Sequence, residues 1–360
     1  MNANRLVKTL ADLYAAYGYQ PYRMSKFEEY DLYARNKDFL LSDQIITFTD
    51  TNGKLLALKP DVTLSIIKNT EDLPGVQKLS YHENVYRVSG HTGAFREQPQ
   101  TGLECIGELG PYDIAEVLLL AGRSLKAISE EAVLDISDLG LLSIVLDAVT
   151  AEKADRREVL RCFYEKNRHE LSALCRERFP AAEDTLDRLM QCQGAPREAL
   201  DQLRDILGGT PAEAELRSLG KVMSLLEGTD VYRMLRLDLS VSGDSKYYNG
   251  IVFKGYVKGV PNSVLTGGRY DNLLRRFHRA SGAVGFAVYL DMLEPLYDGL
   301  PETDVDDLIV CPEEADLPAA IRLRDRLIGE GKRVSVQRLA PGKLRCKNRW
   351  LCKGNEVTPF

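Results

Sequence analysis

A charged helical segment separates two groups of strand-like segments, and this order restricts the fold more than any other feature. Residues 144–228 contain helix-forming runs such as AEKADRREVLRCFYEKNRHELSALCRERF and REALDQLRDIL, broken by glycines and prolines. Strand-like segments precede this stretch and return after it, for example in MLRLDLSV, where leucines alternate with polar residues. The pattern predicts an α+β architecture, an antiparallel sheet flanked by helices and interrupted by a helical insertion.

The segment YRVSGHTGAFREQPQTGLECIG, residues 86–107, predicts a hairpin with unusual polar content. Tyr86–Val88 and Leu103–Ile106 are strand-type, and the glycine-rich residues 90–93 between them are typical of a turn. Packing alone does not require so many charged and amide groups, so we expect a binding surface here. A second hairpin is predicted in QIITFTDTNGKLLALKP, around Asn52 and Gly53.

Both ends of the chain have recognisable patterns. The first twenty residues predict an amphipathic helix, too polar for a secretion signal, with one face formed by Leu6, Leu10, Leu13, Tyr14 and Tyr17. The end of the chain reads as strand (DDLIVC), helix, strand (RVSVQ) and basic tail, a small α/β unit. We therefore expect a core made of residues 1–143 and 229–298, an insertion at 144–228, and a short C-terminal unit at 299–360.

Composition excludes several classes of protein. The 360 residues are 44% hydrophobic and 28% charged, with a net charge of −6, so the overall balance does not indicate nucleic acid or an acidic membrane as partner. No apolar run is long enough to span a bilayer. The seven cysteines form no CxxC pair, which favours reduced thiols in a cytoplasmic protein, and the four histidines form no cluster. We expect neither a metal nor a cofactor.

Residues 10–296 resemble the catalytic core of the histidyl-tRNA synthetases, which have a class II aminoacyl-tRNA synthetase fold. GLECIGELGPYDIAEVLLLA is similar to the end of motif 2 and the helix after it. YYNGIVF resembles the histidine-pocket signature, and GGRYDNLL with AVGFAVYLDML resembles motif 3 and its approach. The resemblance also fits the regulatory subunits of ATP phosphoribosyltransferase, which are paralogs of the synthetases.

The groups that the synthetases use for ATP activation are largely missing. Positions where the resemblance implies phosphate-binding arginines are Met292, Ala94 and Gly243, and the motif 2 glutamate falls on Ser89. Arg87 and Arg96 remain, and Lys246 is a nearby cation without the bidentate geometry of arginine. Because the triphosphate needs several such cations, we expect no aminoacylation activity.

The amino-acid pocket is better preserved. The histidine-binding positions implied by the resemblance are Asp61, Thr63, Gln100, Glu104, Tyr247 and Tyr248, with Arg87 as a further candidate. Carboxylates can hold an ammonium, Arg87 or Gln100 can face a carboxylate, and tyrosines can pack on an imidazole. Alone, the tyrosine pair would indicate core packing and Glu104 a solvated strand residue. The order of the motifs along the chain favours the pocket. Asp61 stands where the synthetases usually have glutamate.

The C-terminal unit gives a second distinction. The residues after Pro301 are too few for the anticodon-binding domain of the synthetases, and the chain begins directly at the first helix. The basic residues of the tail fit either an RNA-binding surface or a solvated or partner-facing surface, and we favour the latter. The basic residues are Lys332, Arg333, Arg338, Lys343, Arg345, Lys347, Arg349 and Lys353.

Two functions follow from the resemblance. The first is a non-catalytic regulatory subunit that binds L-histidine and joins a short-form ATP phosphoribosyltransferase in the first step of histidine biosynthesis. It implies feedback sensing and a homodimer, formed through Tyr17–Asp43, within a hetero-oligomer, without membrane or nucleic acid as partner. The alternative is a divergent histidyl-tRNA synthetase or a synthetase-like ligase.

Overall fold

The computed structural model describes residues 3–36, 45–89, 92–243, 247–297, 303–353 and 356–360. These residues form two compact units, Met1–Leu296 and Tyr297–Phe360. No helix in the described parts of the chain is long and apolar enough to cross a membrane.

The first unit is built on a nine-stranded sheet with the order β1-β5-β6-β12-β11-β10-β7-β9-β8. Its central pairs are antiparallel, whereas β1 pairs with β5 and β7 pairs with β9 in parallel. The strands are β1 Gln20–Pro21, β5 Val76–Val88, β6 Phe95–Gly107, β7 Ala132–Asp138, β8 Gln193–Gly194, β9 Leu235–Asp238, β10 Ile251–Val257, β11 Leu265–Arg269 and β12 Gly282–Tyr289. The α+β class and the mainly antiparallel sheet predicted from the sequence are confirmed.

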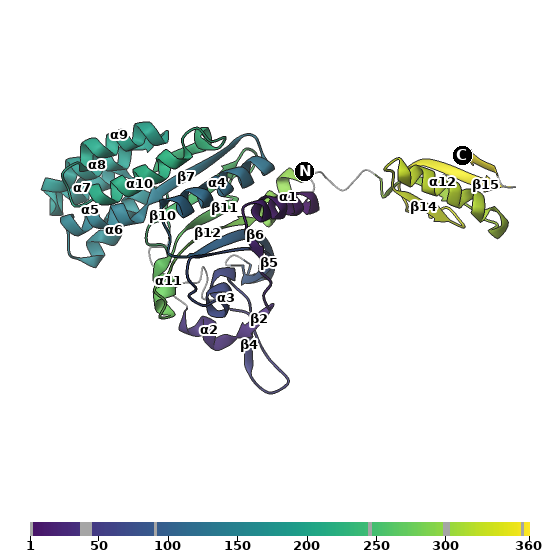
Figure 1. Ribbon diagram of the computed structural model, residues 1–360, viewed down its shortest axis with the longest axis horizontal. Coiled ribbons are helices and arrows are strands. Elements are labelled where there is room, and N and C mark those ends of the chain that lie inside the picture. Colours follow the sequence, from purple (N-terminus) through teal and green to yellow (C-terminus); the bar gives the residue numbers. More distant parts are fainter. Residues whose placement is uncertain (1–2, 37–44, 90–91, 244–246, 298–302, 354–355) are drawn as a thin grey trace. The chain divides into compact units, whose positions relative to one another are not determined.

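Helices α1 (Ala3–Ala16) and α4 (Pro111–Ile128) pack against each other and against the sheet (Figure 1). Helix α1 buries Leu6, Leu10 and Tyr14, as its apolar spacing predicts. The inclusion of Tyr17 in this face is wrong, because the helix ends at Ala16 and Gly18 follows with φ +83°. This left-handed conformation is favourable for glycine and stops the helix.

The hairpin of the polar segment is longer than predicted. Strands β5 and β6 have 13 residues each, and Leu103 pairs with Ser80 rather than with the strand around Tyr86. The predicted bounds were therefore wrong, because residues 95–102 continue β6 despite their polar side chains. Gly90 and His91 of the predicted turn lie outside the described residues.

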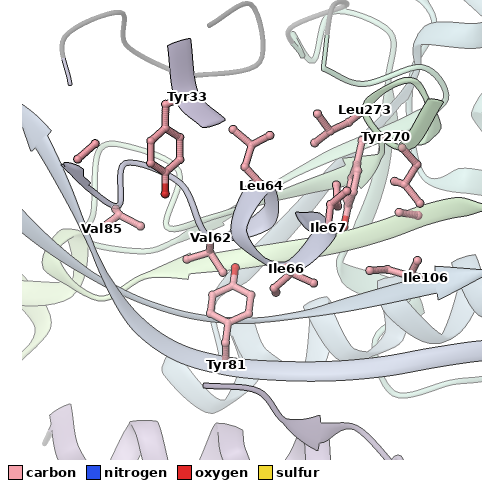
Figure 2. Packing of buried hydrophobic residues seen from close by; sticks show 13 residues of the cluster. Tyr33, Val62, Leu64, Ile66, Ile67, Tyr81, Val85, Ile106, Tyr270 and Leu273 are labelled. Atoms are coloured by element: carbon pink, nitrogen blue, oxygen red, sulfur yellow. The ribbon is translucent and has the colours of Figure 1, made fainter. Parts of the chain in front are cut away.

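A smaller three-stranded sheet, in the order β2-β4-β3, comprises β2 Phe27–Glu29, β3 Thr47–Thr49 and β4 Leu55–Leu58. The hairpin predicted at Asn52 and Gly53 joins β3 to β4, and Gly53 has φ +81°. Helix α2 (Tyr30–Arg35) follows β2, and α3 (Val62–Asn69) follows β4. Figure 2 shows the apolar cluster around α3, with Val62 and Ile66 near Tyr81 of β5.

Between β7 and β9 the chain is mainly helical, and Figure 1 shows these helices gathered together at one end of the large sheet. Helix α10 packs on α4 and α9, which ties this region to the sheet. The helices are α5 Leu139–Val149, α6 Lys153–Tyr164, α7 Arg168–Arg178, α8 Glu183–Gln191, α9 Pro196–Leu207 and α10 Glu213–Leu226. Helix α11 (Asp271–Arg276) follows β11.

The second unit is a four-stranded sheet in the order β14-β13-β15-β16 with helix α12 (Leu317–Gly329) packed on it. The strands are β13 Val305–Val310, β14 Val334–Gln337, β15 Cys346–Lys353 and β16 Glu356–Pro359. The prediction of a basic tail after β14 was wrong, because these residues form two strands. Arg333 and Lys347 pair with Asp306, so part of the basic surface is neutralised internally.

Candidate functional site

One cavity of the first unit, with a volume of about 600 Å³, is lined by every residue that the sequence predicted for the amino-acid pocket. This volume lies in the range of small-molecule sites. The predicted residues that line it are Asp61, Thr63, Arg87, Gln100, Glu104, Tyr247 and Tyr248. The structure therefore brings these residues together, and their role as histidine ligands stays a prediction.

The floor of the cavity is a part of the large sheet where two neighbouring glycines leave the backbone without side chains. Strand register places Glu104 opposite Gly285, and Gly285 opposite Gly268, in one row across β6, β12 and β11. A side chain at 285 would overlap Glu104 Oε2, and a Cβ at 268 would lie 2.7 Å from Tyr248 Cδ1. The two glycines therefore allow the Glu104 carboxylate and the Tyr248 ring to lie directly against the backbone.

Glu104 is the most deeply placed carboxylate of the cavity, with 2% of its surface exposed. Thr63 Oγ1 donates a hydrogen bond of 2.7 Å to Oε1, and the Tyr270 hydroxyl donates one to Oε2. Burial raises the pKa of Glu104 to about 8, against the opposing effect of these two hydrogen bonds, and the nearby Asp61 raises it further. A buried carboxyl with this pKa is suited to ionise when a cationic ligand arrives.

Asp61 and Thr63 lie at the N-terminal end of α3, where β4 turns into the helix. Asp61 is the N-cap, and its Oδ1 accepts a hydrogen bond of 2.9 Å from the Leu64 amide. Burial raises the pKa of Asp61, although the Leu64 amide and Arg87 favour its charged form. Asp61 therefore has a structural role that the sequence reading did not assign to it.

This cap gives a first prediction. Replacing Asp61 with alanine should lower the free energy of unfolding by about 1 kcal/mol, because an N-cap carboxylate satisfies a helix amide that is otherwise unpaired. Asp61→Asn keeps a capping oxygen and should cost much less. Urea unfolding of the two variants measures the difference, and equal losses would contradict the assigned cap.

Arg87 and Gln100 also line the cavity, from the paired strands β5 and β6. The Arg87 Nε donates to the Pro60 carbonyl oxygen at 3.2 Å, so the side chain is held near Asp61. Gln100 is 4% exposed, and its Nε2 has no hydrogen-bond partner in the described part of the molecule. A buried amide without a partner is costly, so this donor is available to a ligand.

Tyrosines form one wall of the cavity. The rings of Tyr247 and Tyr248 have centroids 4.7 Å apart in an edge-to-face arrangement, and Tyr247 lies 5.5 Å from Tyr270. Tyr270 also belongs to the apolar cluster around α3 (Figure 2). Such a wall can pack against a planar ring while offering hydroxyl groups to it.

The cavity is also lined by Gly243 and Met292, two uncharged residues at positions where the resemblance implies arginines. Ala94 is exposed and does not line it, and Lys246 lies outside the described residues. Sequence reasoning missed Lys254, whose Nζ donates to Ser242 Oγ at 3.0 Å. Lys254 lies two residues after Val252 on β10, so both side chains are on the same face of the strand. This two-residue spacing was visible in the sequence.

Tyr270 was missed as well, although it hydrogen-bonds to the central carboxylate. The described residues contain no group of three or more histidine, cysteine or acidic side chains that could hold a metal ion.

The chain was compared with protein families and with known proteins. The family model described as histidyl-tRNA synthetase matches residues 1–293. An ATP phosphoribosyltransferase regulatory subunit of Oceanobacillus iheyensis is 26% identical over 92% of this chain and 84% of its own. Another, of Moorella thermoacetica, is 30% identical over 80% of this chain and 76% of its own. A histidine–tRNA ligase of Methanocaldococcus jannaschii is 28% identical over 94% and 82%.

A solved structure supports the same fold. The crystal structure of an ATP phosphoribosyltransferase regulatory subunit/histidyl-tRNA synthetase from Bacillus halodurans has a TM-score of 0.82 with 24% identity. The match covers 98% of this chain and 94% of that chain. From the family match and these relatives, the chain belongs to the histidyl-tRNA synthetase family, in the group that includes the regulatory subunits of ATP phosphoribosyltransferase.

Proposed function

We propose that this protein is a non-catalytic regulatory subunit of ATP phosphoribosyltransferase that binds L-histidine in the cavity described above. One observation carries the proposal: the cavity retains buried carboxyls and a tyrosine wall but lacks a cluster of cations. Arg87 and Lys254 are the basic side chains among the described residues that line it. The names of the relatives support the regulatory role over the synthetase role.

The retained groups suit histidine. Its cationic nitrogen groups would donate to Glu104, which lies deepest, and Thr63 holds that carboxylate in place. The Gln100 amide is a further donor, and the imidazole ring would pack on Tyr247 and Tyr248. Asp61, which also lines the cavity, would add a second carboxyl group to the same site.

The missing groups argue against ATP activation. Each preorganised charge contact to a developing negative charge typically contributes about 3 kcal/mol to transition-state stabilisation. Gly243 and Met292 supply none, and Arg87 is engaged by the Pro60 carbonyl. Without a reaction to consume it, bound histidine would act as an effector.

The partner would be a short-form catalytic subunit, and histidine would report the level of the pathway's end product. Feedback requires histidine to bind one state of the complex more tightly than another, with a typical coupling of about 1–3 kcal/mol. A homodimer through residues 17–43, part of which lies outside the described residues, and a cytoplasmic location belong to the same proposal.

Two measurements on the purified chain test the proposal. Calorimetry should detect histidine binding, whereas histidine-dependent ATP–pyrophosphate exchange should stay at background, because the phosphate-binding cations are missing. Adding a short-form catalytic subunit should restore ATP phosphoribosyltransferase activity that histidine inhibits. Robust exchange activity would instead favour a divergent histidyl-tRNA synthetase, and the absence of histidine binding would contradict the effector site.

A further inference from the structure

Lys254 differs from two other lysines of the first unit that are removed from solvent, completely or in part. Lys59 is fully buried and pairs with Glu83 at 2.8 Å, and Lys78 pairs with Glu116 at 2.5 Å. Lys254 lines the cavity, and its Nζ makes a hydrogen bond only to the neutral Ser242 hydroxyl among the described residues.

The neighbouring strands do not supply a counter-ion. Asp135 of β7 lies opposite Lys254 in the strand register, yet the described residues show no ion pair between them. Burial lowers the pKa of Lys254, and no carboxylate in the described part of the chain offsets that effect. The lysine therefore presents a partly desolvated positive charge to the cavity.

We propose that Lys254 binds the carboxylate of the amino-acid ligand in this cavity. The inference rests on the proposed function, since it concerns the ligand of the same cavity. Ser242, which accepts the hydrogen bond from Lys254, directly precedes Gly243 in the chain. The charge of Lys254 therefore lies beside this glycine, where a Cβ would meet Val252 of the same strand at 3.0 Å.

The geometry of the floor fits an amino acid between Glu104 and Lys254. The Glu104 carboxylate lies over Gly285 of β12, and Lys254 is on β10, two strands across and two residues along, which is about 12 Å between the backbone positions. In the row that contains Lys254, the residues of β11 and β12 are Thr266 and Ala287. These small side chains leave room for a ligand that donates from a cationic nitrogen to Glu104 and accepts from Lys254 at its carboxylate.

Arg87 is the competing candidate for the ligand carboxylate. Its Nε is held by the Pro60 carbonyl, and its charge favours the ionised form of Asp61, whose pKa burial nevertheless raises. Arg87 is on β5 and lies opposite Arg96 of β6 in the strand register. Lys254 is on β10, and β12 and β11 lie between β6 and β10 in the sheet. Arg87 therefore has the electrostatic influence of an internal carboxylate, whereas none acts on Lys254 among the described residues.

Calorimetry with two ligands tests the inference. Histidine and histidinol share the amine and the imidazole, but histidinol has a hydroxymethyl group in place of the carboxylate. The wild-type protein should prefer histidine by about ten- to a hundredfold, because a hydrogen bond between two charged groups is lost in histidinol. Lys254→Met, similar in length and uncharged, should bring the two affinities close together by weakening histidine alone. Lys254→Arg should keep most of the preference.

The controls separate the possible failures. Arg87→Met should retain the preference for histidine over histidinol. Equal weakening of both ligands by Lys254→Met, or an unchanged preference, would show that Lys254 only supports the structure and would overturn the inference. If the wild type binds inorganic phosphate through Lys254 while histidine is also bound, Lys254 serves a separate anion and not the histidine carboxylate. That result would also overturn the inference. If neither ligand binds to the wild type, the proposed function itself fails.

Discussion

Glu104→Gln should lower histidine affinity by about ten- to a hundredfold at pH 8, because a hydrogen bond to a charged group contributes about 1.5–3 kcal/mol. In the wild type, affinity should rise between pH 6 and pH 8 by up to about tenfold per pH unit, since the ligand needs the ionised carboxylate and its pKa is about 8. In Glu104→Gln this rise of the affinity with pH should be absent, and only the pH dependence caused by the ligand's own titratable groups should remain. Calorimetry at several pH values measures both effects.

The same substitution should stabilise the empty protein at high pH. The pKa of Glu104 is about 8 in the fold and near its ordinary value of 4.5 when unfolded, so between these values the folded state binds the extra proton. Stability is therefore lost as the pH rises through this window. Glu104→Gln should gain on the order of a few kcal/mol at pH 9 and little near pH 4.5.

Glu97→Gln is the matched control for both effects. Glu97 lies on the same strand, is exposed, and accepts a hydrogen bond of 3.1 Å from the Tyr86 hydroxyl outside the cavity. It should change neither histidine affinity nor the pH dependence of stability. If Glu104→Gln leaves affinity and its pH slope unchanged, the effector site lies elsewhere and the retained cavity reflects ancestry alone.

Gly285→Ala should abolish measurable histidine binding and destabilise the protein by about 1–3 kcal/mol, the typical cost of overpacking. The added Cβ would overlap Glu104 Oε2 and lie 2.5 Å from the Leu103 carbonyl oxygen. The carboxylate has to move, and the backbone of β6 restricts where it can go. Urea unfolding and calorimetry on the same preparation measure the two losses.

Gly220→Ala provides the control for this substitution. Gly220 lies inside α10, and a Cβ there would meet its nearest atom, Arg204 Nη2, at 3.8 Å. Alanine should therefore stabilise the helix by about 0.5–1 kcal/mol and leave binding unchanged. Full stability and affinity in Gly285→Ala would contradict the position of the Glu104 carboxylate over the sheet.

Local patterns in the sequence predicted the parts of the fold that local chemistry determines. The spacing of Leu6 and Leu10 predicted α1, and Asn52 with Gly53 predicted the turn between β3 and β4. The strands β15 and β16 were missed because their alternating basic residues match a solvated tail as well as an exposed strand. Arg345 and Lys347 are neutralised by Asp304 and Asp306, acidic residues some 40 positions earlier in the chain, and no short window contains both partners.

The site shows the same limit. The resemblance of short motifs identified seven of the residues that line the cavity. The motifs did not indicate how these side chains contact each other. Tyr270 reaches Glu104 across 166 positions of the chain, and Lys254 reaches the cavity through the register of β10. Asp61 was assigned to the ligand alone, although its carboxylate also caps α3. The contact of Tyr270 with Glu104 depends on tertiary structure, which local patterns do not encode, whereas the Asp61 cap is a local contact that was overlooked.

Helix α3 gives the cavity a mechanical connection to the outer three-stranded sheet. Thr63, near its first turn, contacts Glu104, whereas Ser65 and Lys68 both bond to Glu28 of β2, at 3.2 Å and 2.6 Å. Between these ends the helix is packed in the apolar cluster, which resists local deformation. A ligand that shifted Thr63 would therefore act on Glu28 of β2 as well, a strand that does not border the cavity.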